Sequence, residues 1–293
     1  MTGTTEIALL TNPTSGKGKG ARARDAALER FAEAGVPVHS LQGRDAAEAL
    51  DLARSVVAEG AGTLVIAGGD GMAHLGAQAV AGTGTALGII PAGTGNDVAR
   101  YLDLPRKDFR AAADRVLAGR RRTIDLARSG SQHFVTVLAA GFDAIVNERA
   151  NEMTWPKGQM RYNLATVAEL RTLKPISYVL EIDGEQHRFD ATMVAVGNGT
   201  SFGGGLRITE GALLDDGLLD VVIIEPMSRT MLLRTYPKLF KGTHVHHPGY
   251  RHHHAKKVTI AAPGITAYAD GERIGPLPLT VEVAPLALRV LVP

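Results

Sequence analysis

Apolar and polar positions follow two different patterns along the chain. In the first 125 residues, short apolar runs typical of buried strands alternate with stretches of helical spacing, such as Ala23, Ala27 and Phe31. Strands are predicted at 6–11, 36–41, 64–66 and 85–90, and helices at 23–34, 46–60, 72–81 and 109–119. Because strands and helices alternate with short connections, residues 1–125 are predicted to form a doubly wound α/β domain.

From Arg121 onward the pattern changes to short strands separated by turn residues. Asp-Gly pairs, which favour tight hairpin turns, occur at 183–184, 216–217 and 270–271. A helical insert is predicted at about 160–173. Residues 126–293 are therefore predicted to form an antiparallel β-sandwich domain, whose last strand can return to the first domain.

Composition narrows the class of protein. The chain of 293 residues has a net charge of +2, which gives no global field for nucleic acid. It contains no cysteine, so disulfides and thiolate metal sites are excluded. No apolar run reaches the roughly 18 residues that span a bilayer, and the N-terminus lacks the basic region of a signal peptide. We expect a cytoplasmic protein that can contact the inner face of the membrane.

Three glycine-bearing loops follow predicted strands. Gly68-Gly69-Asp70-Gly71 lies between a strand and a helix, where glycines let backbone N–H groups approach a phosphate. The Asp70 carboxylate would repel that phosphate unless a cation lies between them or the carboxylate handles a proton. The loop therefore indicates a nucleotide with Mg²⁺; a tight turn without a ligand is the alternative.

The other two loops lie at 12–20 and 91–97. The first is basic, but it has neither P-loop spacing nor the G-x-G-x-x-G fingerprint, so a flexible surface loop is its alternative. Because ligands bind outside the carboxyl ends of parallel strands, three such loops together indicate a ligand site more strongly than any one of them.

Five short motifs occur in order along nearly the whole chain. They are Asn12-Pro13-x-Ser15-Gly16, Gly68-Gly69-Asp70-Gly71, Pro91-x-Gly93-Thr94-Gly95-Asn96-Asp97, Asp215-Asp216-Gly217-x-x-Asp220-Val221 and Asp270-Gly271-Glu272. Together they resemble the diacylglycerol kinase catalytic-domain family, in its bacterial soluble lipid-kinase branch. Sphingosine and ceramide kinases are more distant relatives of that family, and NAD kinases are remote ones.

The resemblance implies a lipid kinase whose active site lies in the cleft between two domains. ATP would lie over the glycine loops of the first domain, and the second domain would bind the membrane lipid whose hydroxyl receives the γ-phosphoryl group. By the same resemblance, the residues that contact ATP are Asn12, Pro13, Thr14, Ser15, Gly16, Ser40, Gly68, Gly69, Asp70, Gly71, Met72, Ala73, His74, Thr94 and Asp97.

Acidic residues would hold Mg²⁺ and accept the proton. The resemblance implies that Asp70, Asp97 and Asp125 organise Mg²⁺ and its waters. It also implies a second Mg²⁺ held by Asp216 and the carbonyls of Leu213 and Leu218, since oxygen ligands suit this hard cation. The base that accepts the proton of the lipid hydroxyl is expected to be Glu272, then Asp270, then Asp70.

Two departures from the family pattern keep other functions open. Met72 stands where the family usually has a threonine, and His74 stands where an asparagine is common. A non-catalytic nucleotide- or lipid-binding regulator is therefore one alternative, and an NAD kinase-like enzyme is the other. The expected partner is a membrane lipid met by peripheral contact, with no nucleic acid; a homodimer is left open.

Histidines gather in the segment 244–254 beside Arg251, Lys256 and Lys257. They are His244, His246, His247, His252, His253 and His254. A transition-metal site and a basic patch for anionic lipid headgroups are two interpretations. We favour a third, a polar loop and the solvated face of a strand, because the segment offers no carboxylate or cysteine to complete a ligand set.

Overall fold

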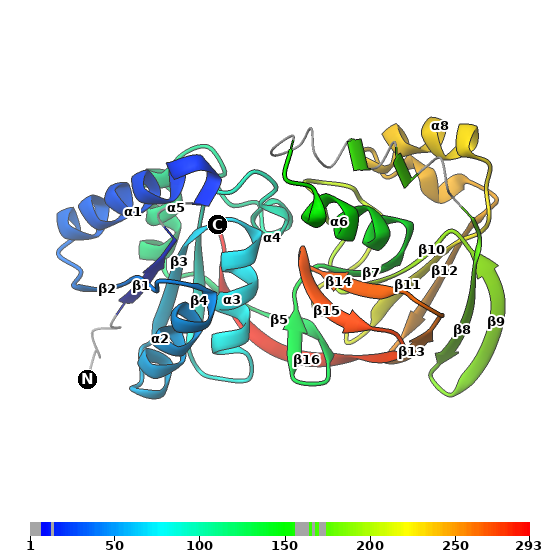
Figure 1. Cartoon of the computed structure of the whole chain (residues 1–293). Coiled ribbons are helices and arrows are strands. Elements are labelled where there is room, and N and C mark those ends of the chain that lie inside the picture. The colour runs from blue at the N-terminus through cyan, green and yellow to red at the C-terminus, as the bar shows by residue number, and fades with distance from the viewer. Residues whose placement is uncertain (1–6, 13–14, 156–163, 166–167, 170–173) are drawn as a thin grey trace. The chain divides into compact units, whose positions relative to one another are not determined.

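The computed structural model describes residues 7–12, 15–155, 164–165, 168–169 and 174–293 (Figure 1). The chain divides into two compact units. The first comprises Met1–Leu126, His133–Val135 and Ala284–Pro293; the second comprises Ala127–Gln132 and Thr136–Val283. Among the described residues, no helix has the length and apolar character needed to cross a membrane.

The first unit is built on a parallel sheet. Its strand order is β2 (Val38–Leu41), β1 (Ile7–Thr11), β3 (Thr63–Gly68), β4 (Ala86–Pro91), and then the end of β16 (Leu279–Leu291). β1, β3 and β4 are buried along their whole lengths, as their continuous apolar runs predict. The last strand therefore belongs partly to the first unit.

Helices flank this sheet. They are α1 (Ser15–Glu33), α2 (Ala46–Ala58), α3 (Asp70–Val80), α4 (Asp97–Tyr101) and α5 (Phe109–Ala118). α1 packs on α5, and α2 packs on α3. Phe31 of α1 and Val116 of α5 share one core with Val65 and Ile90 of the sheet. The N-caps predicted for α2 and α5 are confirmed, since Asp45 and Asp108 each accept a backbone N–H three residues on.

The second unit contains antiparallel β-structure, as predicted. One sheet has the order β12 (Tyr250–Ala255), β11 (Leu219–Ile224), β10 (Met193–Gly197), β7 (Val137–Gly141), β14 (Thr266–Ala269), β15 (Glu272–Pro276). The other strands of this unit are the start of β16, β13 (Lys257–Ala261), β8 (Ile176–Ile182) and β9 (Glu185–Ala191). Tyr178 of β8 is buried and donates a hydrogen bond to the carbonyl of Ala140 at 2.8 Å, which ties the two sheets together.

Two of the predicted hairpin turns have the expected backbone. Both central residues have positive φ in Asp183-Gly184 (46° and 95°) and in Asp270-Gly271 (53° and 87°). The flanking residues pair directly, Ile182 with Glu185 and Ala269 with Glu272. These are the two-residue turns that favour Asp-Gly, so the local sequence explains them.

Several element boundaries differ from the predictions. Within the segment predicted as a loop after β1, the helix α1 begins at Ser15. An added Cβ on Gly16 would lie 1.9 Å from the carbonyl oxygen of Ala92, and one on Gly20 would lie 2.0 Å from that of Asn12, so both positions need glycine. Gly16 and Gly18 have positive φ, 58° and 87°, which glycine adopts at little cost.

Among the described residues of the second unit, two α-helices and the short 3₁₀ helix η1 (Thr243–His246) were not predicted. The α-helices are α6 (Phe142–Glu152) and α8 (Arg229–Leu239). Ser228 caps α8 by accepting the backbone N–H of Met231. Most of the helical insert predicted at about 160–173 lies outside the described residues.

Candidate functional site

The three glycine loops converge at the carboxyl ends of β1, β3 and β4. An added Cβ on Gly93 would lie 2.4 Å from the Cα of Gly69, and one on Gly68 would lie 3.3 Å from the Ser15 hydroxyl oxygen. The backbones of the second and third loops therefore touch, and the first loop packs on both. Side chains larger than hydrogen at Gly69 and Gly93 would separate the loops, so these glycines leave bare backbone at this edge of the sheet.

Asp70 ties the second loop to the third. Its Oδ2 accepts the backbone N–H of Asn96 at 2.8 Å, and its Oδ1 accepts that of Asp97 at 2.6 Å. Asn96 adopts a left-handed conformation with φ of 52° and exchanges two hydrogen bonds with the backbone of Gly93, both at 2.9 Å. The carboxylate thus holds the start of α4 in position as well as placing a negative charge beside the loops.

Several residues predicted to contact ATP lie at the same edge of the sheet. Asn12 and Thr94 are exposed in the first and third loops, and Ser40 is exposed near the carboxyl end of β2. Ser15 and Gly16 begin α1. Pro13 and Thr14 lie outside the described residues.

The structure gives Met72, Ala73 and His74 another environment. Met72 and Ala73 are buried, and their N–H groups donate to the carbonyl of Gly69 at 3.0 and 3.1 Å. The Nε2 atom of His74 lies 3.3 Å from the side-chain nitrogen of Gln78, which also bonds to the backbone of His133. Met72 packs against Gly68, where an added Cβ would lie 2.4 Å from the Met72 Cγ atom, and it carries no hydroxyl group.

Two further acidic residues of the first unit are buried. Asp97 lies 3.9 Å from the guanidinium of Arg100, and Asp125 accepts the backbone N–H of Leu286 at 2.7 Å. Asp70 and Asp97 begin α3 and α4, where helix N-termini and carboxylates occur together. Carboxylate oxygens are ligands that Mg²⁺ prefers, so these side chains fit the predicted cation.

The two acidic residues of the late motif in the second unit, Asp270 and Glu272, differ in burial. Asp270 is buried, and its Oδ1 accepts both the N–H and the hydroxyl of Thr136, at 2.9 and 2.6 Å. Glu272 opens β15 with an exposed side chain. Of the two, Glu272 has the more accessible carboxylate for a proton from a substrate.

The residues predicted for a second Mg²⁺ lie close in sequence before β11. Asp216 is exposed and its Oδ1 accepts the backbone N–H of Leu218 at 3.0 Å. The side chain of Leu213 is also exposed. This turn offers carboxylate and carbonyl oxygens, which is the ligand chemistry of Mg²⁺.

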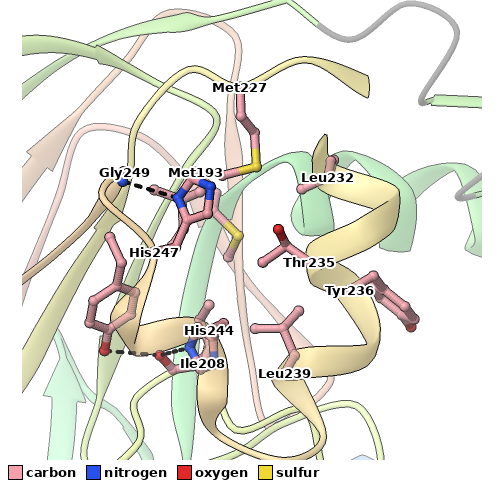
Figure 2. Close-up of a pocket in the computed structure, with 12 residues that line it drawn as sticks. Met193, Ile208, Met227, Leu232, Thr235, Tyr236, Leu239, His244, His247 and Gly249 are labelled. Atoms are coloured by element: carbon pink, nitrogen blue, oxygen red, sulfur yellow. Dashed lines mark hydrogen bonds between the residues drawn. The ribbon is translucent and has the colours of Figure 1, made fainter. Parts of the chain in front are cut away.

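A small apolar pocket, which was not predicted, lies between α8 and the six-stranded sheet (Figure 2). Its cavity volume of about 40 Å³ is room for at least one water-sized group. Apolar side chains and two histidines line it; they include Met193, Ile208, Met227, Leu232, Leu239 and His244. Burial lowers the pKa of His244, and its hydrogen bond to the carbonyl of Ile208 opposes this.

Two family models match the chain. The model described as the diacylglycerol kinase catalytic domain matches residues 6–129. The model described as the YegS C-terminal NAD kinase beta sandwich-like domain matches residues 136–292. Together they cover both units.

Whole-chain relatives agree with these matches. A protein named diacylglycerol kinase from Mycobacterium tuberculosis (strain ATCC 25618 / H37Rv) is 45% identical over 98% of this chain and 95% of its own. One from Bacillus subtilis (strain 168) with the same name is 27% identical over 92% of this chain and 90% of its own. The crystal structure of a diacylglycerol kinase from Bacillus anthracis str. Sterne, 23% identical, has a TM-score of 0.79 over 99% of this chain and 97% of that one, and so has the same fold.

Proposed function

Because the chain belongs to the diacylglycerol kinase family of lipid kinases, we propose that it transfers the γ-phosphoryl group of ATP to a hydroxyl of a membrane lipid such as diacylglycerol, with Mg²⁺. The observation that carries the proposal is the convergence of three glycine loops on one sheet edge, with Asp70 binding the start of α4. Phosphoryl transfer needs chiefly positioning and charge neutralisation, and such an edge supplies both.

Within the first unit, the loops would hold the phosphates and the carboxylates would hold the cation. Backbone N–H groups at the starts of α1 and α3 are suited to phosphate oxygens. Asp70 and Asp97 would position Mg²⁺ through its waters, and Mg²⁺ when bound supplies positive charge to the phosphates. Since Asp70 also orders the third loop, its charge serves the ligand and the protein together.

Glu272 is the residue we propose as proton acceptor for the lipid hydroxyl. Its side chain is exposed, whereas Asp270 is buried and bound by Thr136, and both Asp70 oxygens accept backbone N–H groups. A general base must come within hydrogen-bond reach of the proton it takes, which an exposed and unrestrained carboxylate can do.

Helix α8 is the segment we propose for membrane contact. It exposes Met231 and Leu233, with 39% and 56% of their surface accessible, and Phe240 at its C-cap is 49% exposed. Arg229, Arg234 and Lys238 lie on the same helix. Apolar and basic side chains on one helix suit the interface of a membrane with anionic lipids.

A kinase assay with a lipid panel tests the proposed function. The purified protein is incubated with labelled ATP and Mg²⁺ and with diacylglycerol, phosphatidylglycerol, a sphingoid base or, separately, NAD. We expect label in a lipid, with diacylglycerol the best acceptor. Labelled NADP with no labelled lipid would instead favour the NAD kinase-like activity, and binding of ATP without turnover on any acceptor would favour the regulator.

Membrane contact is tested separately with a triple variant, Met231→Ser, Leu233→Ser and Phe240→Ser. We expect lower activity on lipid in vesicles and unchanged activity on a short-chain, monomeric diacylglycerol. Leu286→Ser is the matched control, because Leu286 is 60% exposed but lies in the first unit. Equal loss on both forms of the lipid would show that α8 acts on catalysis or stability and not on the membrane.

A further inference from the structure

The strand pair β11–β12 gathers one carboxylate and two imidazoles on one face. Asp220 pairs directly with His254 across the antiparallel ladder, and His252 lies two residues away on the same strand. Side chains two residues apart in a strand share a face, so all three project the same way. His253, between the two, belongs to the opposite face.

The donor atoms are close enough to share one ion. Asp220 Oδ1 lies 2.6 Å from His252 Nε2 and 3.4 Å from His254 Nε2, and the ligand atoms of all three lie within 4.8 Å of one another. In a tetrahedral Zn²⁺ site with bonds of about 2.0–2.1 Å, neighbouring ligand atoms are about 3.3 Å apart. The His254 distance already matches, and the His252 distance is that of a hydrogen bond, which must open by less than 1 Å.

Burial distinguishes this cluster from an ordinary surface group of polar residues. The side chain of Asp220 is only 2% exposed, although it carries a carboxylate, whereas those of His252 and His254 are 30% and 54% exposed. A buried carboxylate needs a partner of positive charge or a set of donors. The two imidazoles are the solvent-exposed members of the cluster, so an ion that reaches them from solvent would meet a buried negative ligand.

We propose that Asp220, His252 and His254 bind a first-row transition-metal ion, with Zn²⁺ as the principal candidate and water in the fourth position. Nitrogen and carboxylate donors suit Zn²⁺, whereas Mg²⁺ prefers oxygen alone. Each imidazole would bind through Nε2 in its neutral form, with the ring hydrogen on Nδ1.

The bound ion would join β11 to β12, which is the outer strand of its sheet. Asp220 lies in the fourth family motif, but none of the three residues is among those proposed to bind ATP or Mg²⁺ or to accept the proton. Zinc binding would stabilise the folded second unit, since the ligand set exists only when the two strands are in register.

Calorimetry with ZnCl₂ and MgCl₂ on chelator-treated full-length protein tests this site. We expect the wild type to bind one Zn²⁺ per chain. We expect Mg²⁺ not to compete for this site. The double variant His252→Gln, His254→Gln should lose affinity by more than the roughly 10–100-fold that removal of an outer hydrogen-bond partner costs a metal site. His253→Gln is the matched control, since it changes the same strand on its other face, and should bind as the wild type does.

Thermal unfolding with and without Zn²⁺ gives a second readout that does not depend on activity. The melting temperature of the wild type and of His253→Gln should rise with Zn²⁺, and that of the double variant should not. Absence of stoichiometric Zn²⁺ binding by the wild type, or equal binding by the double variant, would overturn the proposal. Lost binding in His253→Gln would overturn it too, because it would move the site to the opposite face.

Discussion

Asp70 in the first unit and Glu272 in the second both lie at turns beside strands, yet they are held in opposite ways. Both oxygens of Asp70 accept backbone N–H groups, at 2.8 and 2.6 Å. Glu272 is exposed at the start of β15, although its neighbour Asp270 is buried and bound by Thr136. A restrained carboxylate gives structure and fixed charge, whereas an exposed one can take up a proton, so their loss should damage the protein differently.

The largest effect is expected from Glu272→Gln. The substitution keeps shape and removes basicity, so turnover should fall by about 10²–10⁴-fold, the range that general-base catalysis contributes. The KM for ATP and the melting temperature should stay near wild-type values, because the side chain is exposed. Steady-state kinetics and thermal unfolding measure both. Near wild-type turnover would exclude Glu272 as the base.

Asp70→Asn should lower turnover and stability together. The two oxygens of Asp70 now each accept a backbone N–H group. In the variant, the side-chain NH₂ group would face one of these donors and could not accept from it. The start of α4 would therefore lose one hydrogen bond, at a cost of about 1–3 kcal/mol of stability. Turnover should fall with a higher requirement for Mg²⁺. Denaturant unfolding and Mg²⁺ titrations at fixed ATP check the two effects. A variant of unchanged stability would show that these hydrogen bonds contribute little.

Asp270→Asn sharpens the comparison, because Asp270 is restrained like Asp70 but lies beside Glu272. The amide oxygen can still accept from Thr136, so we expect the loss of a charge-assisted bond, about 1 kcal/mol of stability, and a smaller fall in turnover than with Glu272→Gln. Urea unfolding and kinetics on the two variants side by side measure the difference. A greater loss of turnover in Asp270→Asn would reverse the ranking of the two acids.

What the sequence predicted well is local. The caps at Asp45 and Asp108 and the turns at Asp183-Gly184 and Asp270-Gly271 depend on contacts within a few residues. The alternation of strands and helices likewise predicted the parallel sheet. The convergence of the glycine loops followed from the rule that parallel strands present their carboxyl ends at one edge. The roles of individual loop residues came from family resemblance.

What the sequence could not provide depends on register and packing between distant segments. Asp220 lies 32 residues before His252, so the histidine segment seemed to lack a carboxylate; that inference was wrong, because pairing of β11 with β12 supplies one. The burial of Met72 depends on how α3 packs at Gly68. Helix α8 contains Pro237 near its end. Proline inside a segment argues against a helix when only the sequence is known, but the folded chain accommodates it here.

His244 is a restrained group of another kind, a buried imidazole. Its substitution is expected to have the smallest effect of those considered, and that effect is on the pH dependence of stability. His244 is buried in the pocket of Figure 2, its Nε2 lies 3.3 Å from the carbonyl oxygen of Ile208, and its Nδ1 has no partner among the described residues. Burial lowers its pKa in the folded protein below the ordinary value of about 6.5. The unfolded chain therefore binds more protons in the window below that value. Stability is complete above about pH 6.5 and is lost as the pH falls from there toward the lower pKa of the folded state.

His244→Phe should remove this dependence. The phenyl ring can keep the edge contact with Tyr250, now 5.2 Å between ring centroids, and the hydroxyl of Tyr250 still donates to the carbonyl of Ile208 at 3.3 Å. We expect a shallower fall in the free energy of unfolding between pH 7 and pH 5, with turnover at neutral pH unchanged. His246→Gln, at an exposed position of the 3₁₀ helix η1 (Thr243–His246) that also contains His244, should keep the wild-type slope. Urea unfolding at several pH values measures the free energy of unfolding as a function of pH. An equal pH dependence in His244→Phe and the wild type would show that His244 does not control the acid sensitivity of this unit.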